Sequence, residues 1–139
     1  MSTRILIATP DAFLQREYEF SLRKVGYDVL FADSGMACLT RIREAAPELV
    51  VLDTDLRWGG AEGVVAVLAE DATLPPIKIV LISPRLNRTV LYELSRFAVN
   101  DYGTKPVSGT QLLSRVQAMV GTNAVESAAC STNVTTRRC

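Results

Sequence analysis

Five short apolar segments constrain the fold of this chain more than any other feature. The first four are rich in Val, Ile and Leu, the fifth is the least apolar, and segments with helical spacing separate them. Because the apolar residues of the first four run nearly without interruption instead of alternating, these segments are typical of strands that are covered on both faces. The segments are Arg4–Thr9, Asp28–Ala32, Glu48–Asp53, Ile77–Ile82 and Asn100–Thr104.

The intervening segments predict amphipathic helices, because apolar side chains recur every three or four residues. Leu14, Tyr18 and Leu22 follow this spacing in the first helix, and Val90 and Leu94 follow it in the fourth. Strict alternation of strand and helix predicts an α/β fold with right-handed crossovers. We expect a doubly wound five-stranded parallel sheet in the flavodoxin-like order 2-1-3-4-5, with two helices on one face and three on the other.

Helix boundaries are marked by residues that favour the ends of helices. Gly26 follows the first predicted helix, and Pro47 follows the second. Ser34 stands where an N-cap belongs, and Ser108 with Gln111 forms a candidate capping box for the fifth helix.

The length of 139 residues fits one ordinary domain. We expect one folded domain over residues 1–121 and a polar C-terminal tail over residues 122–139, since that last stretch has no aromatic residue and is rich in Ser, Thr and Asn. No apolar stretch is long enough for a signal peptide or a membrane span, so we expect a soluble protein.

Charge and composition exclude several classes of function. Fifteen basic and fifteen acidic residues cancel, which argues against binding to nucleic acid or to anionic membranes. The absence of histidine removes the usual neutral-pH general base and most transition-metal sites, so we do not expect an enzyme. Three cysteines without a CxxC pair favour a reducing compartment, and the cytoplasm fits best.

Functional residues are expected where the strands end, because ligands of doubly wound sheets bind beyond the carboxyl ends of the strands. Four segments should meet at this edge. They are Thr9–Asp11, Asp53–Asp55, Ser83–Arg85 and Thr104–Pro106.

At these strand ends the sequence resembles the receiver domain of bacterial two-component response regulators, over about residues 3–121. Asp53 matches the phosphoacceptor aspartate of that family, and Ser83 matches its Ser/Thr switch position. Tyr102 matches the aromatic switch, and Lys105 with Pro106 matches the Lys-Pro pair, which makes Pro106 a candidate for a cis peptide bond. The resemblance implies that Ser83, Tyr102 and Lys105 contact the phosphoryl group or respond to it.

The chemistry of phosphoryl transfer explains these residue types. A carboxylate accepts a phosphoryl group by in-line attack and becomes an acyl phosphate, while cations balance the charge on the transferring oxygens. Lys105 can supply one such cation. A hydroxyl at Ser83 can donate to a phosphoryl oxygen, and an inward turn of Tyr102 would then convert the local charge into a change of surface.

The sequence departs from the family after the first strand, where receivers carry two adjacent acidic residues that help hold Mg²⁺. Thr9 and Pro10 occupy these positions here. Asp11 follows, and it can cap the first helix or can join Asp53 and Asp55 as a metal ligand. We therefore expect no cofactor other than weakly bound Mg²⁺.

A second departure lies in the loop after the third strand. Arg57 stands where the family usually has proline, and it either forms an ion pair over Asp53 or is solvated. Trp58, the only tryptophan, either anchors the loop or contacts a partner.

The charges are unevenly divided along the chain. Residues 1–71 hold seven basic and twelve acidic groups, a net charge of −5, and residues 72–139 hold eight and three, a net charge of +5. We predict a partner surface on the fourth helix, fifth strand and fifth helix, facing an acidic patch of a histidine kinase, a downstream effector or a second copy of the chain. The basic residues of this surface are Arg85, Arg88, Arg96 and Arg115.

Three hypotheses follow. In the first, the chain is a stand-alone atypical receiver that acts through protein–protein interaction, with phosphorylation of Asp53 weak or lost. In the second, it is an ordinary receiver that takes phosphate from a histidine kinase, with Asp11 substituting for the missing acidic pair. In the third, it is a small flavodoxin-like cofactor-binding protein or enzyme, although no glycine-rich phosphate loop follows the first strand.

Overall fold

The computed structural model describes residues 3–56, 60–74, 76–84 and 99–120. The fourth predicted helix, with Val90 and Leu94, and the predicted tail lie outside these residues. The elements are β1 (Arg4–Ala8), α1 (Ala12–Arg23), β2 (Asp28–Ala32), α2 (Gly35–Ala45), β3 (Leu49–Asp53), α3 (Gly60–Glu70), β4 (Lys78–Ser83), β5 (Asp101–Thr104) and α5 (Gly109–Val120).

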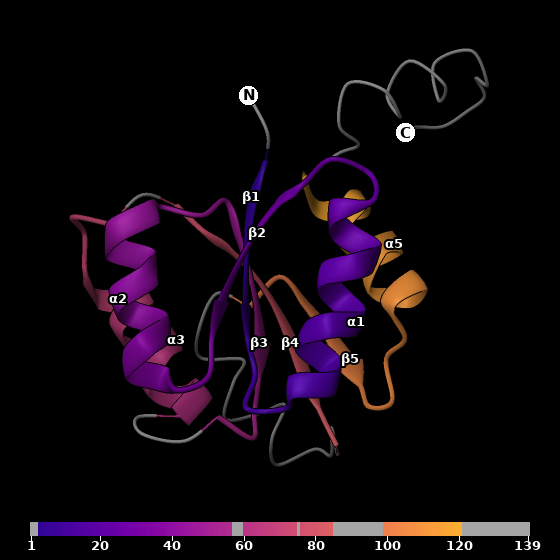
Figure 1. The fold of residues 1–139 in the computed structure, drawn as a ribbon. Helices are drawn as coiled ribbons and strands as arrows, with labels where there is room; N and C mark the ends of the chain where they lie inside the picture. Colours follow the sequence, from indigo (N-terminus) through magenta and orange to yellow (C-terminus); the bar gives the residue numbers. More distant parts are fainter. Residues whose placement is uncertain (1–2, 57–59, 75, 85–98, 121–139) are drawn as a thin grey trace.

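The five strands form one parallel sheet in the order β2-β1-β3-β4-β5, which confirms the predicted fold. Helices α1 and α5 cover one face of this sheet, and α2 and α3 cover the other (Figure 1). Strand ends differ from the sequence prediction by about one residue: β1 ends at Ala8, β3 begins at Leu49 and β4 continues to Ser83. None of the helices in the described ranges combines the length and the apolar character that a bilayer crossing needs.

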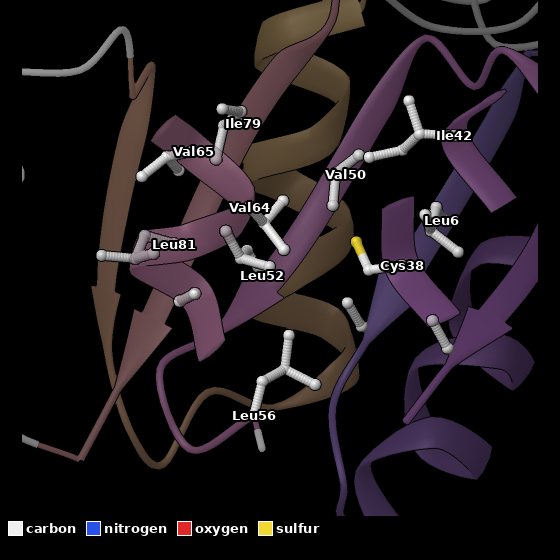
Figure 2. Close-up of a cluster of buried hydrophobic side chains, with 13 residues drawn as sticks. Leu6, Cys38, Ile42, Val50, Leu52, Leu56, Val64, Val65, Ile79 and Leu81 are labelled. Carbon is white, nitrogen blue, oxygen red and sulfur yellow. The ribbon is translucent and has the colours of Figure 1, made fainter. Parts of the chain in front are cut away.

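Successive strand residues enter two separate hydrophobic clusters, as the two-residue period of a strand requires. Leu6 and Val50 pack under α2 and α3, together with Ile42 and Val64 (Figure 2). Their chain neighbours, such as Ile5, point to the opposite face and pack under α1 and α5. Both faces of the sheet are therefore covered, which explains the nearly continuous apolar residues of the first four strand segments.

Side-chain caps fix where the helices begin. The Asp11 carboxylate accepts hydrogen bonds from the backbone N–H groups at the start of α1, and Ser34 Oγ accepts one at the start of α2. Ser108 and Gln111 exchange two hydrogen bonds in the predicted capping box of α5. Gly26 has a φ of 101°, the left-handed conformation that favours glycine at the end of a helix.

Candidate functional site

The carboxyl ends of four strands bring the predicted site residues to one edge of the sheet. Asp53 is the last residue of β3 and lies opposite Ile82 of β4, while Ser83 of β4 lies opposite Thr104 of β5. Thr9 directly follows β1, whose last residue lies opposite Leu52. The parallel register alone therefore gathers Thr9, Asp53 and Ser83 beside the loop that carries Lys105.

The Asp53 carboxylate is fully buried and accepts three hydrogen bonds. Thr9 Oγ1 donates to Asp53 Oδ2 at 2.6 Å, and Lys105 Nζ donates to the same oxygen at 2.7 Å. The backbone N–H of Asp55 donates to Oδ1 at 2.9 Å. Because a buried carboxylate is costly unless it is paired and hydrogen-bonded, this donor set is what allows Asp53 to be charged inside the fold.

The Thr9 hydroxyl is held in one orientation. It accepts a hydrogen bond from the backbone N–H of Asp11 at 3.1 Å, and a hydroxyl has only one proton to donate. That proton is directed at Asp53 Oδ2, 2.6 Å away. The Thr9 carbonyl accepts from Gln15 Nε2 at 3.1 Å, so the start of α1 also fixes the backbone of this residue.

Lys105 bridges two carboxylates of the β3 end. Its Nζ lies 2.7 Å from Asp53 Oδ2 and 3.2 Å from Asp55 Oδ2, and its side chain is 18% exposed. Burial lowers the pKa of Lys105, but the hydrogen bonds and negative charges of Asp53 and Asp55 outweigh this effect, so the pKa is raised overall. Lys105 is therefore a cation at neutral pH. The peptide bond between Lys105 and Pro106 is cis.

Of the three residues proposed as metal ligands, Asp53 and Asp55 both lie beside Lys105 Nζ, and Asp11 is engaged elsewhere. The Asp11 carboxylate is engaged as the cap of α1, which is the first of the two roles considered for it. Asp55 contacts Lys105. Within residues 3–56, 60–74, 76–84 and 99–120, no three His, Cys, Asp or Glu side chains are placed to hold one metal ion together.

The other predicted residues differ in how far the structure describes them. Ser83 is buried at the end of β4, and Tyr102 is half-buried in β5 beside the cluster under α2 and α3. Arg115 forms an ion pair with Asp101 at 2.9 Å and donates to the carbonyl of Tyr102, so its charge is compensated within the domain. The remaining predicted residues lie outside the described residues; they are Arg57, Trp58, Arg85, Arg88 and Arg96.

Comparison with known proteins identifies the fold and the family. No protein-family model matches the chain. The DNA-binding response regulator MtrA of Mycobacterium tuberculosis is 31% identical over 123 residues, 88% of this chain. Chemotaxis protein CheY4 of Vibrio cholerae superposes with a TM-score of 0.79 at 15% identity, covering 86% of this chain and all of that one. The phosphorylated cyanobacterial phytochrome response regulator RcpA has a TM-score of 0.72 at 25% identity, covering 86% and 91% of the two chains.

The chain belongs to the receiver-domain family of response regulators. It spans about half of the length of the curated relatives that it matches, 53% in MtrA. The shared part is the receiver domain, a signalling module. The chain is therefore a response regulator receiver domain of two-component signalling.

Sequence reasoning missed one contact of this site. It treats Thr9 only as the absence of a carboxylate, whereas the Thr9 hydroxyl donates a hydrogen bond directly to Asp53. A signal was present: Thr9 follows a strand that neighbours the strand ending at Asp53, and a hydroxyl beside a buried carboxylate has a ready acceptor. The position alone could have suggested the contact.

Proposed function

We propose that this receiver domain works through protein–protein contacts, that it is not an enzyme, and that Asp53 accepts a phosphoryl group poorly. The single observation that supports the proposal is the hydrogen bond of 2.6 Å from Thr9 Oγ1 to Asp53 Oδ2. A neutral donor stands at the position where the family carries acidic residues that help hold Mg²⁺.

The donors around Asp53 oppose its use as a nucleophile. Oδ2 already accepts from Thr9 and Lys105, and Oδ1 accepts from the Asp55 N–H. Attack on phosphorus by Oδ2 would have to break or weaken two of these hydrogen bonds. Phosphoryl transfer also needs cations to balance the charge on the transferring oxygens, and Lys105 supplies one of them.

A weak metal site follows from the same donors. Mg²⁺ usually binds through one or two carboxylates and keeps several waters. Asp53 is the one buried carboxylate among the described residues, and Lys105 competes with a metal ion for its Oδ2. Neither Thr9 nor Pro10, directly after β1, has a carboxylate, so these two positions add no negative charge that favours a dication.

The resting state of the site is then balanced without metal or phosphate. Lys105 neutralises Asp53, and the conformation at this edge is set by packing and by whatever protein binds the domain. The proposed partner is a protein, either a histidine kinase or a downstream effector.

Labelling with acetyl phosphate tests the proposal. Purified protein is incubated with the reagent with and without millimolar Mg²⁺, and phosphate on Asp53 is measured by intact mass and peptide mapping. The expected result is low occupancy that depends little on Mg²⁺. The variant Thr9→Asp/Pro10→Asp should gain labelling and Mg²⁺ dependence together, and Asp53→Asn is the blank. Efficient Mg²⁺-dependent labelling of the wild-type chain would reject the proposal.

The second candidate function is that of an ordinary receiver in a phosphorelay with a histidine kinase. It is favoured by the Lys105 ammonium at 2.7 Å from Asp53 and by Ser83 on the adjacent strand, which are the cation and hydroxyl that phosphoryl binding uses. The same labelling experiment separates the two candidates, because only the ordinary receiver takes up phosphate efficiently without restoration of the acidic pair.

A further inference from the structure

Helix α1 holds the connection between β5 and α5 at two points. Tyr18 Oη donates to the carbonyl oxygen of Val107 at 2.8 Å, and Glu17 Oε2 accepts from the backbone N–H of Gly109 at 2.6 Å. The Tyr18 ring is fully buried in the cluster under α1 and α5. Burial, followed by the charges of Glu17, Asp53 and Asp11, raises the pKa of Tyr18, so the phenol remains a donor throughout the neutral range.

These two contacts supply much of the backbone anchoring of the connection. The backbone N–H of Lys105 donates to the carbonyl oxygen of Ser83 at 2.7 Å, but Pro106 has no N–H to donate. Val107 is only 5% exposed, so its carbonyl is shielded from water and needs a partner within the protein. Without the Tyr18 hydroxyl, this carbonyl would be left unsatisfied unless the segment moved.

Close packing of α5 on α1 adds to the constraint. A Cβ atom built on Gly109 would lie 2.1 Å from Ser21 Oγ and 3.1 Å from the Glu17 carbonyl oxygen. The first turn of α5 therefore sits directly against α1, as the adjacent paths of the two helices indicate (Figure 1). Lys105 lies four residues before Gly109, so it begins a short segment whose other end is held against α1.

We propose that Tyr18 and Glu17 are positioning residues for the site: by holding Val107 and Gly109, they fix the backbone from which Lys105 reaches Asp53. Both residues act on Lys105 indirectly, through the segment that connects β5 to α5. The inference rests on the proposed function for its meaning in signalling, since the Lys105–Asp53 pair is the charge balance invoked there. Its geometry does not depend on whether Asp53 accepts phosphate.

The reactivity of the Lys105 amine toward an acylating reagent reports how firmly Lys105 is held beside Asp53. The chain has three lysines, so Lys105 can be compared with Lys24 in the same sample. Intact protein is treated briefly with an amine-acylating reagent at one fixed pH, and acylation of each lysine is measured by peptide mass spectrometry. Tyr18→Phe keeps the ring and removes the hydroxyl. The expected ratio of Lys105 to Lys24 acylation rises about fivefold, the shift that the loss of one average hydrogen bond produces.

Matched controls separate positioning from general loosening. Ile42→Val removes one buried methyl group from the cluster on the opposite face and should leave the ratio unchanged. Glu17→Ala should raise the ratio, whereas Glu19→Ala, which removes the exposed partner of Arg23 on the same helix, should not. If Tyr18→Phe does not fold, the Glu17 and Glu19 pair decides the question.

The proposal is overturned if Tyr18→Phe and Glu17→Ala match their controls. It is supported if both raise the ratio while the controls do not. The acylation ratio is measured without phosphate, so its outcome is independent of the acetyl phosphate experiment. Efficient labelling of wild-type Asp53 together with a raised ratio would reject the proposed function and leave the positioning role intact.

Discussion

Asp53 carries a buried charge whose compensation is divided between a cation and a hydroxyl. Lys105 provides the opposite charge, and Thr9 provides a second donor to the same oxygen. Removing one partner of a buried polar contact costs more than the contact contributed, because the remaining group stays desolvated. Thr9 should therefore matter to stability although it carries no charge.

Thr9→Val tests this role at constant shape. The variant deprives Asp53 Oδ2 of one donor and the Asp11 N–H of its acceptor, so we expect the free energy of unfolding to fall by about 1–3 kcal/mol. Thr9→Ser keeps the hydroxyl and should cost much less. Urea unfolding of the three proteins measures the difference. Equal losses in Val and Ser variants would mean that the methyl group, and not the hydroxyl, matters here.

The raised pKa of Lys105 predicts a loss of stability at alkaline pH. A lysine with a folded-state pKa above its unfolded value of about 10.4 stabilises the fold fully below that value, and the contribution disappears as pH rises through the folded-state pKa. The urea midpoint of wild type should therefore fall more between neutral pH and about pH 11 than that of Lys105→Met. Lys78→Met should retain the wild-type fall. Parallel falls in all three proteins would contradict the prediction.

The sequence could predict which residues meet at the site, but not which hydrogen bonds their side chains form there. Asp53, Ser83 and Lys105 could be placed together because strand ends meet at one edge of a parallel sheet. The position of Thr9 could have suggested a contact with Asp53, but not that its hydroxyl proton is directed at the carboxylate, because that orientation is fixed by the Asp11 N–H. The role of Asp11 was open for a similar reason: an aspartate before a helix can cap it or face the site, and the structure shows the cap.

At the scale of elements, the apolar periodicity predicted which strands and helices form better than it predicted the residues at which they begin and end. Alternation of strands and helices predicted the parallel sheet, and the flavodoxin-like class supplied its strand order. The two clusters that share the strands explain the two-sided apolar pattern. Strand ends differed by one residue because the polar residue that follows an apolar run can fall on either side of the boundary: β4 includes Ser83, whereas β1 stops before Thr9. The N–H of Thr9 still donates to the carbonyl of Ala32 at 3.0 Å although β1 ends at Ala8.

Two helical glycines should respond in opposite directions to alanine. Gly109→Ala places a Cβ against Ser21 Oγ and the Glu17 carbonyl, where space is lacking, so we expect a loss of about 1–3 kcal/mol. Gly63→Ala in α3 meets nothing within 4 Å and should gain up to about 1 kcal/mol from helix propensity. Urea midpoints of the two variants provide the test.

Ser21→Ala offers an internal check on the Gly109 prediction. The side-chain oxygen of Ser21 is the nearest atom to the added Cβ, so Ser21→Ala/Gly109→Ala should recover part of the loss. No recovery would place the cost elsewhere, at the Glu17 carbonyl or in the start of α5.

Across the whole molecule, contacts at the site edge join the acidic first half of the chain to the basic second half. Asp53 and Asp55 come from the first half and Lys105 from the second. The same halves meet where β3 pairs with β4 and where Tyr18 donates to Val107. The cluster under α1 and α5 draws on both halves, and Ile79 and Leu81 of the second half complete the cluster under α2 and α3. We therefore expect the domain to unfold as one unit.

Cys38 provides a probe of that cooperativity. It is a fully buried residue of α2 and belongs to the same cluster as Leu6, Ile42 and Val50 (Figure 2). Burial raises the pKa of its thiol to about 12, so at pH 8 the thiol is almost entirely protonated in the folded state. Alkylation should therefore proceed through an opened state. In Cys130→Ser/Cys139→Ser protein, we expect the logarithm of the Cys38 alkylation rate to rise with urea with the slope of global unfolding, and Thr9→Val to accelerate it by the factor that its measured loss of stability predicts. Alkylation that does not depend on urea would instead show that α2 opens locally, and the two halves would then not form a single cooperative unit.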